Sequence, residues 1–295
     1  AHTVSAIRAM SYFSRVAAIN EVMNGITLYR FYDELERNFE EKYEETAEKL
    51  QELCKVIFRK ENFMSDITAE EDGIVAWEAF VPKIADKLYT CEVRTGSFEP
   101  EVTKKNEGFM TSGQVQYVCS AGNFFKKGYE YTGAFQVLKV MMGYEYLWSQ
   151  IREKGGAYGC MCAFGKTGDC YFVSYRDPNL EKTIDVYKHA AEAVASFNAD
   201  ERTMTQYIIG AVSEMDTPMT PSALGVFSLG GYMTHRSEAD NQKERDQVLN
   251  CTEKDIQALA GHIKAFMDED ALCVVGNADK ILSAKALFDR IEQLF

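Results

Sequence analysis

Residues 151–159 read IREKGGAYG and bring an arginine, two adjacent glycines and a tyrosine into one short stretch. Arg152 carries a planar guanidinium with several N–H donors in a fixed fork, and Tyr158 carries one phenolic O–H donor. Gly155 and Gly156 allow backbone dihedral angles that other residues resist, so the chain can swing there from a helix into a strand. Both side chains could then face one space and donate hydrogen bonds to the carbonyl oxygens of an extended peptide, or to an oxyanion that develops on one of them.

A purely structural interpretation of the same stretch remains open. The two glycines can close a helix at its C-terminus, Arg152 can interact with the negative end of the helix dipole, and Tyr158 can lie in the core. The residue types and their spacing do not decide between these two interpretations.

Metal-binding motifs are incomplete in this sequence. The stretch HAAEA (189–193) resembles HxxEH, whose two histidines bind zinc from one helix face, but Ala193 replaces the second histidine. His189 also lies off the apolar stripe of its own helix, which favours a solvated surface position. Cys160 and Cys162 would share one face of a strand, yet no second ligand pair lies nearby in the sequence. We therefore expect this chain to bind no metal by itself.

Other catalytic motifs are absent from the sequence. The stretch GKTGD (165–169) fails the full P-loop spacing and is predicted to be a hairpin turn. There is no GxSxG, and no cysteine–histidine pair stands out as a nucleophile system. The eight cysteines form no CxxC pairs and mostly lie in apolar stretches, as expected for buried thiols in a reducing compartment.

The composition excludes several classes of protein. The 295 residues are 46% hydrophobic and 26% charged, which is typical of a globular protein with room for two domains, or one and a half. No run of about 18 apolar residues predicts a membrane helix. The net charge of -13 disfavours nucleic acid and either favours cationic peptides or serves solubility alone. The first residues show neither Met nor a signal peptide, so we expect a piece of a longer chain in a cytoplasmic, bacterial setting.

The hydrophobic pattern predicts two units separated by a linker. Residues 3–60 and 76–88 have helical spacing, with Pro82 as a break in the second segment, and residues 65–72 could end a strand. Residues 91–107 lose periodicity and gain charge, Gly and Pro, as in a linker.

The second unit is predicted to begin near Gly108 as an α+β fold, a two-layer mixed sheet backed by helices. Val115, Tyr117 and Cys119 alternate with polar residues, which indicates a half-buried strand. The expected elements are strands at 113–122 and 271–277, a hairpin at 157–178, helices at 133–150, 180–197, 198–216, 253–267 and 279–295, and an interruption at 217–234.

Two longer stretches carry a resemblance to a known family. LWSQIREKGGAYG and FVSYRDPNLEKTIDVYKHAAEAV together resemble the fourth domain of presequence-protease-type zinc metallopeptidases, inverzincins of the pitrilysin/insulinase family. The resemblance extends over most of residues 108–295. Residues 1–90 look like the C-terminal part of a third, homologous α+β domain, which leaves residues 91–107 as the linker to the fourth (C-terminal) domain.

The resemblance implies a division of labour between two halves of an enzyme. Members of the family have four similar domains that close around a chamber and degrade unfolded oligopeptides without ATP. The first half holds Zn through HxxEH and a further Glu, and a glutamate there deprotonates the zinc-bound water. The last domain supplies an Arg and a Tyr, which match Arg152 and Tyr158 here. Arg152 would bind the substrate backbone, and Tyr158 would stabilise the oxyanion as a catalytic residue.

On this interpretation the chain is the non-zinc-binding C-terminal half of a zinc metalloendopeptidase and is inactive alone. Its partners would be the N-terminal half of the same enzyme and unfolded peptides, with no nucleic acid and no membrane. Two alternatives remain: a catalytically inactive scaffold homologue, and a peptide-binding module whose affinity for cationic peptides is weakened by salt. An unrelated α+β enzyme would need a complete catalytic constellation, which the motifs do not provide.

Overall fold

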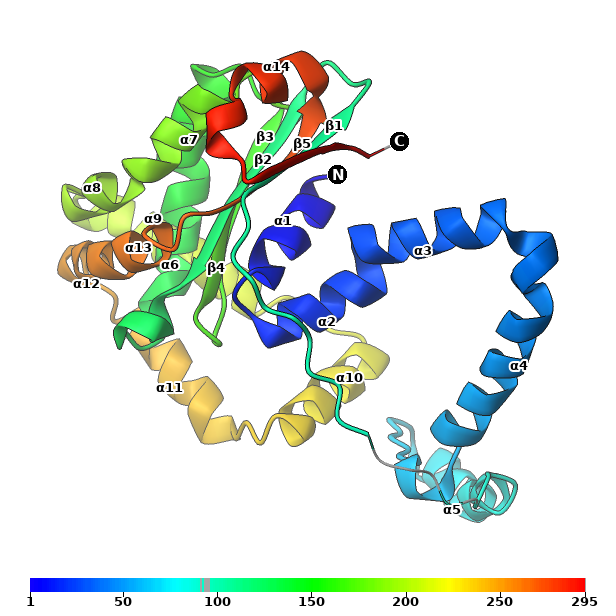
Figure 1. Ribbon diagram of the computed structural model, residues 1–295. Coiled ribbons are helices and arrows are strands. Elements are labelled where there is room, and N and C mark those ends of the chain that lie inside the picture. Colours follow the sequence, from blue (N-terminus) through cyan, green and yellow to red (C-terminus); the bar gives the residue numbers. More distant parts are fainter. Residues whose placement is uncertain (91, 93–95, 295) are drawn as a thin grey trace. The chain divides into compact units, whose positions relative to one another are not determined.

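The computed structural model describes residues 1–90, 92 and 96–294. Cys91 and residues 93–95 of the predicted linker lie outside the described residues, as does Phe295 at the end of the last predicted helix. The chain forms two compact units (Figure 1). Unit 1 comprises residues 1–30, 99–216 and 242–295, and unit 2 comprises residues 31–98 and 217–241. Each unit is described by itself.

Unit 1 is built on a six-stranded mixed sheet with the strand order β3-β4-β2-β5-β1-β6. The pairs β3–β4, β4–β2 and β2–β5 are antiparallel, whereas β1 runs parallel to both β5 and β6. The predicted α+β fold with a mixed sheet is confirmed. The strands are β1 (Glu107–Thr111), β2 (Gln116–Asn123), β3 (Gly159–Phe164), β4 (Asp169–Tyr175), β5 (Ala271–Asn277) and β6 (Arg290–Gln293).

A layer of helices covers one face of this sheet (Figure 1). Val118, Phe172 and Val274 of three strands form a continuous buried core with Leu138 and Phe266 of the helices. The Asp200 side chain caps the start of α9 by accepting a hydrogen bond from the N–H of Thr203. The helices of this layer are α6 (Ala134–Met141), α7 (Glu181–Lys188), α8 (Ala190–Ala195), α9 (Glu201–Met215), α12 (Glu253–Ala258) and α13 (Ala260–Met267).

The first helices of the chain cover the opposite face of the sheet. Ala6 and Ala9 of α1 (His2–Ser11) pack with Phe109, Cys119 and Cys273 of three strands, and α2 (Arg15–Asn24) follows. The expectation that the strand of Tyr117 and Cys119 would be only half-buried is wrong, because α1 covers their face while the helix layer covers the opposite face at Val118. The sequence pattern did not reveal this contact between distant segments.

A buried ion pair fastens α1 to the sheet. The Glu107 side chain is 1% exposed and accepts hydrogen bonds from Arg8 Nε at 2.6 Å and from the Tyr12 hydroxyl at 2.8 Å. Burial alone would raise the pKa of Glu107, but the hydrogen bond and charge of Arg8 outweigh burial and lower it. The carboxylate is therefore held ionised between helix and strand.

Several predicted elements differ from the structure. Where one helix was expected over residues 279–295, helix α14 (Ala278–Ser283) and a short 3₁₀ turn, η5 (Lys285–Leu287), lead into strand β6, which pairs with β1. Pro82 does not break α5 (Glu71–Ala85), and residues 65–70 form no strand. The segment expected to interrupt the helices contains α10 (Pro221–Met233), with Pro221 in its first turn and Thr220 as N-cap.

Unit 2 consists of helices with little core of their own. Helix α3 (Ile26–Arg37) crosses into it, followed by α4 (Phe39–Ile57), the short turn η1 (Lys60–Asn62), α5 and α10. Helix α11 (Glu238–Leu249) then leads back into unit 1. Every side chain of α4 and α5, all of them described, is at least partly exposed. Within the described residues, each helix of the protein is too short or too polar to span a lipid bilayer.

Candidate functional site

The helix that carries Arg152 ends in wide turns. After α6 the chain continues as two π-helical segments, η3 (Met142–Tyr146) and η4 (Trp148–Glu153). Leu147 and Ile151 are almost fully buried and anchor these turns in the core, whereas Arg152 lies half-buried at the surface. Such wide turns recur at functional sites, because they rotate side chains out of ordinary helical register.

The double glycine closes this helix, as the structural interpretation proposed. Gly156 has a φ of 79° and donates its N–H to the carbonyl of Arg152 at 2.9 Å. A Cβ atom at Gly155 would lie 2.4 Å from the carbonyl oxygen of Ile151, so no larger residue fits there without a shift. The chain can therefore turn from η4 directly into β3.

Tyr158 stands directly before β3 and lies at the surface. Its backbone N–H donates to the carbonyl of Tyr175 at 3.1 Å, which ties it to the end of β4. Its side chain is 63% exposed, and its ring meets the ring of Tyr175 edge-on at a centroid distance of 5.6 Å. The alternative that placed Tyr158 in the core is wrong.

Arg152 and Tyr158 lie together. The Arg152 Nη1 atom donates a hydrogen bond to the backbone carbonyl of Tyr158 at 2.5 Å. Its guanidinium carbon lies 4.1 Å from the centroid of the Trp148 ring and 5.5 Å from that of the Tyr158 ring. Contacts of a cation with aromatic rings hold the guanidinium in place while leaving its edges available for further hydrogen bonds.

A second segment, SYRDPNL (174–180), supports the same loop through hydrogen bonds. The Asn179 side-chain amide donates to the carbonyl of Gly155 at 2.6 Å. Asp177 is fully buried and accepts hydrogen bonds from the backbone N–H of Asn179 at 2.8 Å and from the Thr183 hydroxyl at 2.6 Å. Burial raises the pKa of Asp177, although the hydrogen bonds of Thr183 and Asn179 partly oppose this. The sequence indicated a turn at Asp-Pro, but it did not indicate which loop the turn would support.

Arg176 of the same segment was not singled out from the sequence. It has a φ of 49°, in the left-handed region that side chains with a Cβ rarely adopt. Its guanidinium carbon lies 5.9 Å from the centroid of the Tyr158 ring and 5.6 Å from that of Tyr175. Arg152, Tyr158 and Arg176 thus form one group at the surface, which we call the Arg–Tyr patch.

Within the part of the chain that the structure describes, the histidine and cysteine motifs form no metal site. Among the described residues, no three or more His, Cys, Asp or Glu side chains are grouped as metal ligands would be. His189 is exposed at the end of α7, where a hydrogen bond to the Asp185 carbonyl and the Asp185 charge raise its pKa. Burial raises the pKa of Cys160 to about 11 and that of Cys162 to about 12, so both are protonated at neutral pH, whereas metals bind thiolates.

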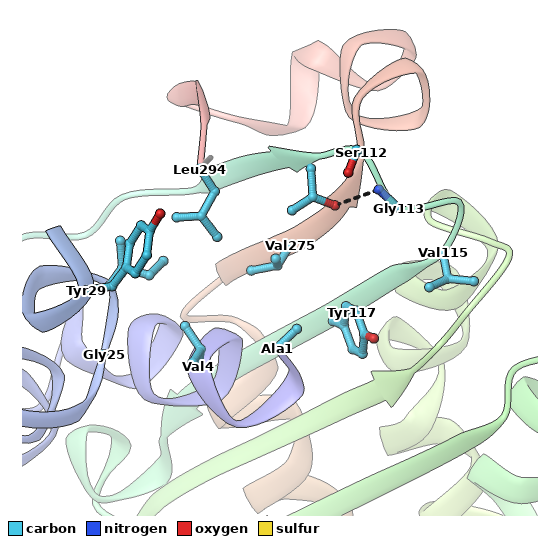
Figure 2. Close-up of a pocket in the computed structure, with 12 residues that line it drawn as sticks. Ala1, Val4, Gly25, Tyr29, Ser112, Gly113, Val115, Tyr117, Val275 and Leu294 are labelled. Carbon is cyan, nitrogen blue, oxygen red and sulfur yellow. Dashed lines mark hydrogen bonds between the residues drawn. The ribbon is translucent and has the colours of Figure 1, made fainter. Parts of the chain in front are cut away.

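An apolar pocket lies on the α1 side of the sheet in unit 1 (Figure 2). It has a volume of about 450 Å³, and its lining includes Val4, Tyr29, Tyr117, Val275 and Leu294. The Tyr117 ring lies 5.7 Å from the Tyr175 ring, which in turn contacts Tyr158 of the Arg–Tyr patch. A row of tyrosines therefore connects the pocket to the patch across three neighbouring strands.

Comparison with known proteins identifies the family. The family model described as the PreP C-terminal domain matches residues 106–279, which include the whole Arg–Tyr patch. The chain is 34% identical over 293 residues to "Protein HypA" of Clostridium perfringens and 29% identical over 287 residues to "Presequence protease 1, chloroplastic/mitochondrial" of Arabidopsis thaliana. It spans 30% and 26% of the lengths of these two relatives.

Solved structures share the fold of this chain at low sequence identity. A protease from Helicobacter pylori superposes with a TM-score of 0.50 and 11% identity, covering 71% of this chain and 53% of that one. From the family match and the relatives together, the chain belongs to the PreP C-terminal domain family and is a C-terminal part of a presequence-protease-like peptidase.

Proposed function

We propose that this chain is the C-terminal part of a zinc metalloendopeptidase that degrades unfolded oligopeptides in a closed chamber, and that Arg152 and Tyr158 bind the substrate there. The observation that carries the proposal is the juxtaposition of a guanidinium and an exposed phenol within a segment that matches the family. The name presequence protease, which relatives carry, supports a peptide substrate.

The two side chains suit complementary tasks. Arg152 uses one N–H on the Tyr158 carbonyl, and it makes no other side-chain hydrogen bond within the described part of the chain. Its remaining donors can bind backbone carbonyls of an extended peptide. The Tyr158 hydroxyl projects from a strand end that is fixed by the β3–β4 ladder, so it can donate to an oxyanion without reorganisation.

Zinc belongs to another part of the proposed enzyme. The described residues offer no suitable ligand group, so the metal would be held by the N-terminal half, the proposed partner of this chain. When bound, zinc lowers the pKa of a water molecule and polarises the scissile carbonyl. The free thiols and the similarity to a Clostridium perfringens protein support a cytoplasmic, bacterial setting.

The test is Tyr158→Phe in the full-length protein that contains this chain. We expect kcat on a fluorogenic peptide to fall by about 10²–10³, as for the loss of one oxyanion donor. The melting temperature should not change, because the exposed ring is retained and only its hydroxyl is lost. Tyr144→Phe is the matched control, since Tyr144 is also exposed, at 75%, but lies outside the Arg–Tyr patch. An unaltered kcat in Tyr158→Phe would reject the catalytic role.

A further inference from the structure

We propose that Arg176 is a third substrate-binding residue, which together with Arg152 forms a site for a carboxylate group of the bound peptide. The inference rests on the proposed function, because it assigns a ligand to the same patch. Such a site would favour peptides that carry a carboxylate group, whereas the other proposed contacts involve only the peptide backbone.

The backbone holds Arg176 in place from both sides. Its neighbour Tyr175 pairs with Gly159 in the β3–β4 ladder. Its other neighbour, Asp177, exchanges two backbone hydrogen bonds with Gln116, at 2.7 and 2.9 Å, and has a fully buried side chain. A left-handed conformation at a residue with a Cβ persists only where the surroundings enforce it, and such residues cluster at binding sites.

The two arginines of the patch have no carboxylate partner among the residues that the structure describes. The chain has 45 acidic and 32 basic residues, and many of its arginines pair with carboxylates, as Arg8 does with Glu107 and Arg245 with Asp216. Neither Arg152 nor Arg176 makes an ion pair within the described residues, although both lie beside the Tyr158 ring. Two unpaired cations at one exposed place in an acidic protein favour an anionic ligand.

The chemistry of the two side chains identifies the anion. A guanidinium presents parallel N–H donors that match the two oxygens of a carboxylate, which is the strongest arrangement available to it. For a peptide substrate, this carboxylate is either the free C-terminus or an Asp or Glu side chain. Both sources present the same group, so the experiment must separate them.

The experiment measures peptide binding to the full-length protein after zinc has been removed with a chelator, so that no cleavage occurs. One fluorescently labelled peptide is made with a C-terminal acid or amide, and with an internal Glu or Gln. We expect one acid-bearing peptide to bind about three- to tenfold more tightly than its neutral counterpart, the range for an exposed charge-assisted contact. Arg176→Gln should abolish this preference and leave the Kd of the neutral peptide within about twofold.

Two further variants keep the result interpretable. Arg202→Gln removes one exposed positive charge from α9, in the helical layer, and should retain the preference. Arg176→Lys keeps the charge but loses the fork, so an intermediate preference is expected. Melting temperatures show whether each variant is folded.

Several outcomes would overturn the inference. The first is equal binding of acidic and neutral peptides by the unaltered protein. The second is a preference for the acidic peptide that survives Arg176→Gln. The third is a loss of affinity in Arg176→Gln that is equal for both peptides. The proposed catalytic role is judged separately. If Tyr158→Phe cleaved at the full rate while Arg176→Gln abolished the preference, the oxyanion role would fail and the carboxylate site would stand.

Discussion

Gly156 is the single residue on which the geometry of the Arg–Tyr patch depends most directly. With a φ of 79° it closes the helix behind Arg152 and starts the turn into Tyr158. A Cβ at this position would meet nothing closer than Pro178 Cγ at 3.7 Å, so the backbone conformation alone requires glycine.

Gly156→Ala should therefore act through backbone strain. We expect a loss of about 1–2 kcal/mol in the free energy of unfolding, the cost of a left-handed conformation for a residue with a Cβ. The turn should also shift, lowering kcat/KM of the full-length protein on peptides. Gly143→Ala is the matched control: a Cβ there meets nothing within 4 Å, its φ is not positive, and alanine should be neutral or stabilising in η3. Denaturant unfolding and peptide kinetics on both variants check this, and equal stability of the two would contradict it.

The sequence predicted part of this patch and missed the rest for a physical reason. Arg152 and Tyr158 are six positions apart across a glycine turn, so local geometry could bring them together, as it does. Arg176 and Asn179 reach the same loop from a segment about twenty residues further along the chain. The pairing of β3 with β4 creates those contacts, and no local pattern encodes them. The exposure of Tyr158 was also undecidable, because either face of a strand start can accept a tyrosine.

At the scale of elements, the attachment of α1 to the sheet depends on the ionisation of Glu107. Its pKa is lower in the folded protein than its usual value, so the stabilisation is fully present above about pH 4.5. The stabilisation is lost as the pH falls through the lowered pKa. Stability falls on acidification because the unfolded chain binds a proton at Glu107 more readily than the folded chain does.

Glu107→Gln should remove this pH dependence and lower stability at neutral pH. We expect a loss of about 3 kcal/mol at pH 7, since the partly buried Arg8 loses its main partner. The difference between variant and unaltered protein should shrink on acidification below pH 4.5. Thermal unfolding between pH 3 and 7 measures this, with Glu201→Gln as control, because Glu201 is exposed at the start of α9. A difference that stayed constant over the whole pH range would disprove the assignment.

Elements with strong local signals were predicted, and those formed by pairing were not. The hairpin around GKTGD has a turn glycine, Gly168, with a φ of 83°, and residues 271–276 form an uninterrupted apolar run that ends at Asn277. Strands β1 and β6 were missed because they are short and β6 is mostly polar. Their identity as strands comes from parallel pairing between residues over 180 positions apart.

For the whole molecule, we expect the 295-residue chain alone to bind no zinc stoichiometrically and to cleave no peptide. The described residues bring no ligand group together, and the thiols of Cys160 and Cys162 in β3 are protonated at neutral pH. Metal analysis after gel filtration and a fluorogenic peptide assay, each with and without the N-terminal half, test this. One zinc per chain, or cleavage by the chain alone, would contradict it.

The division of the chain into units could not be obtained from its linear order. The sequence suggested a break at residues 91–107, where periodicity is lost. In the structure each unit is assembled from separate stretches, and residues 1–30 belong with the sheet of the later segments. The assignment of residues 1–90 to a third homologous domain stays a prediction.

The placement of the first thirty residues has a consequence for limited proteolysis. A single cut between residues 31 and 98 would sever the covalent path to α1, yet Arg8 would still be bound to Glu107 and Ser14 to Asp169. The nicked protein would elute from gel filtration as one species and separate into two bands only on a denaturing gel. The amino-terminal fragment would thus behave as a tightly held subunit, a ready starting point for fragment complementation.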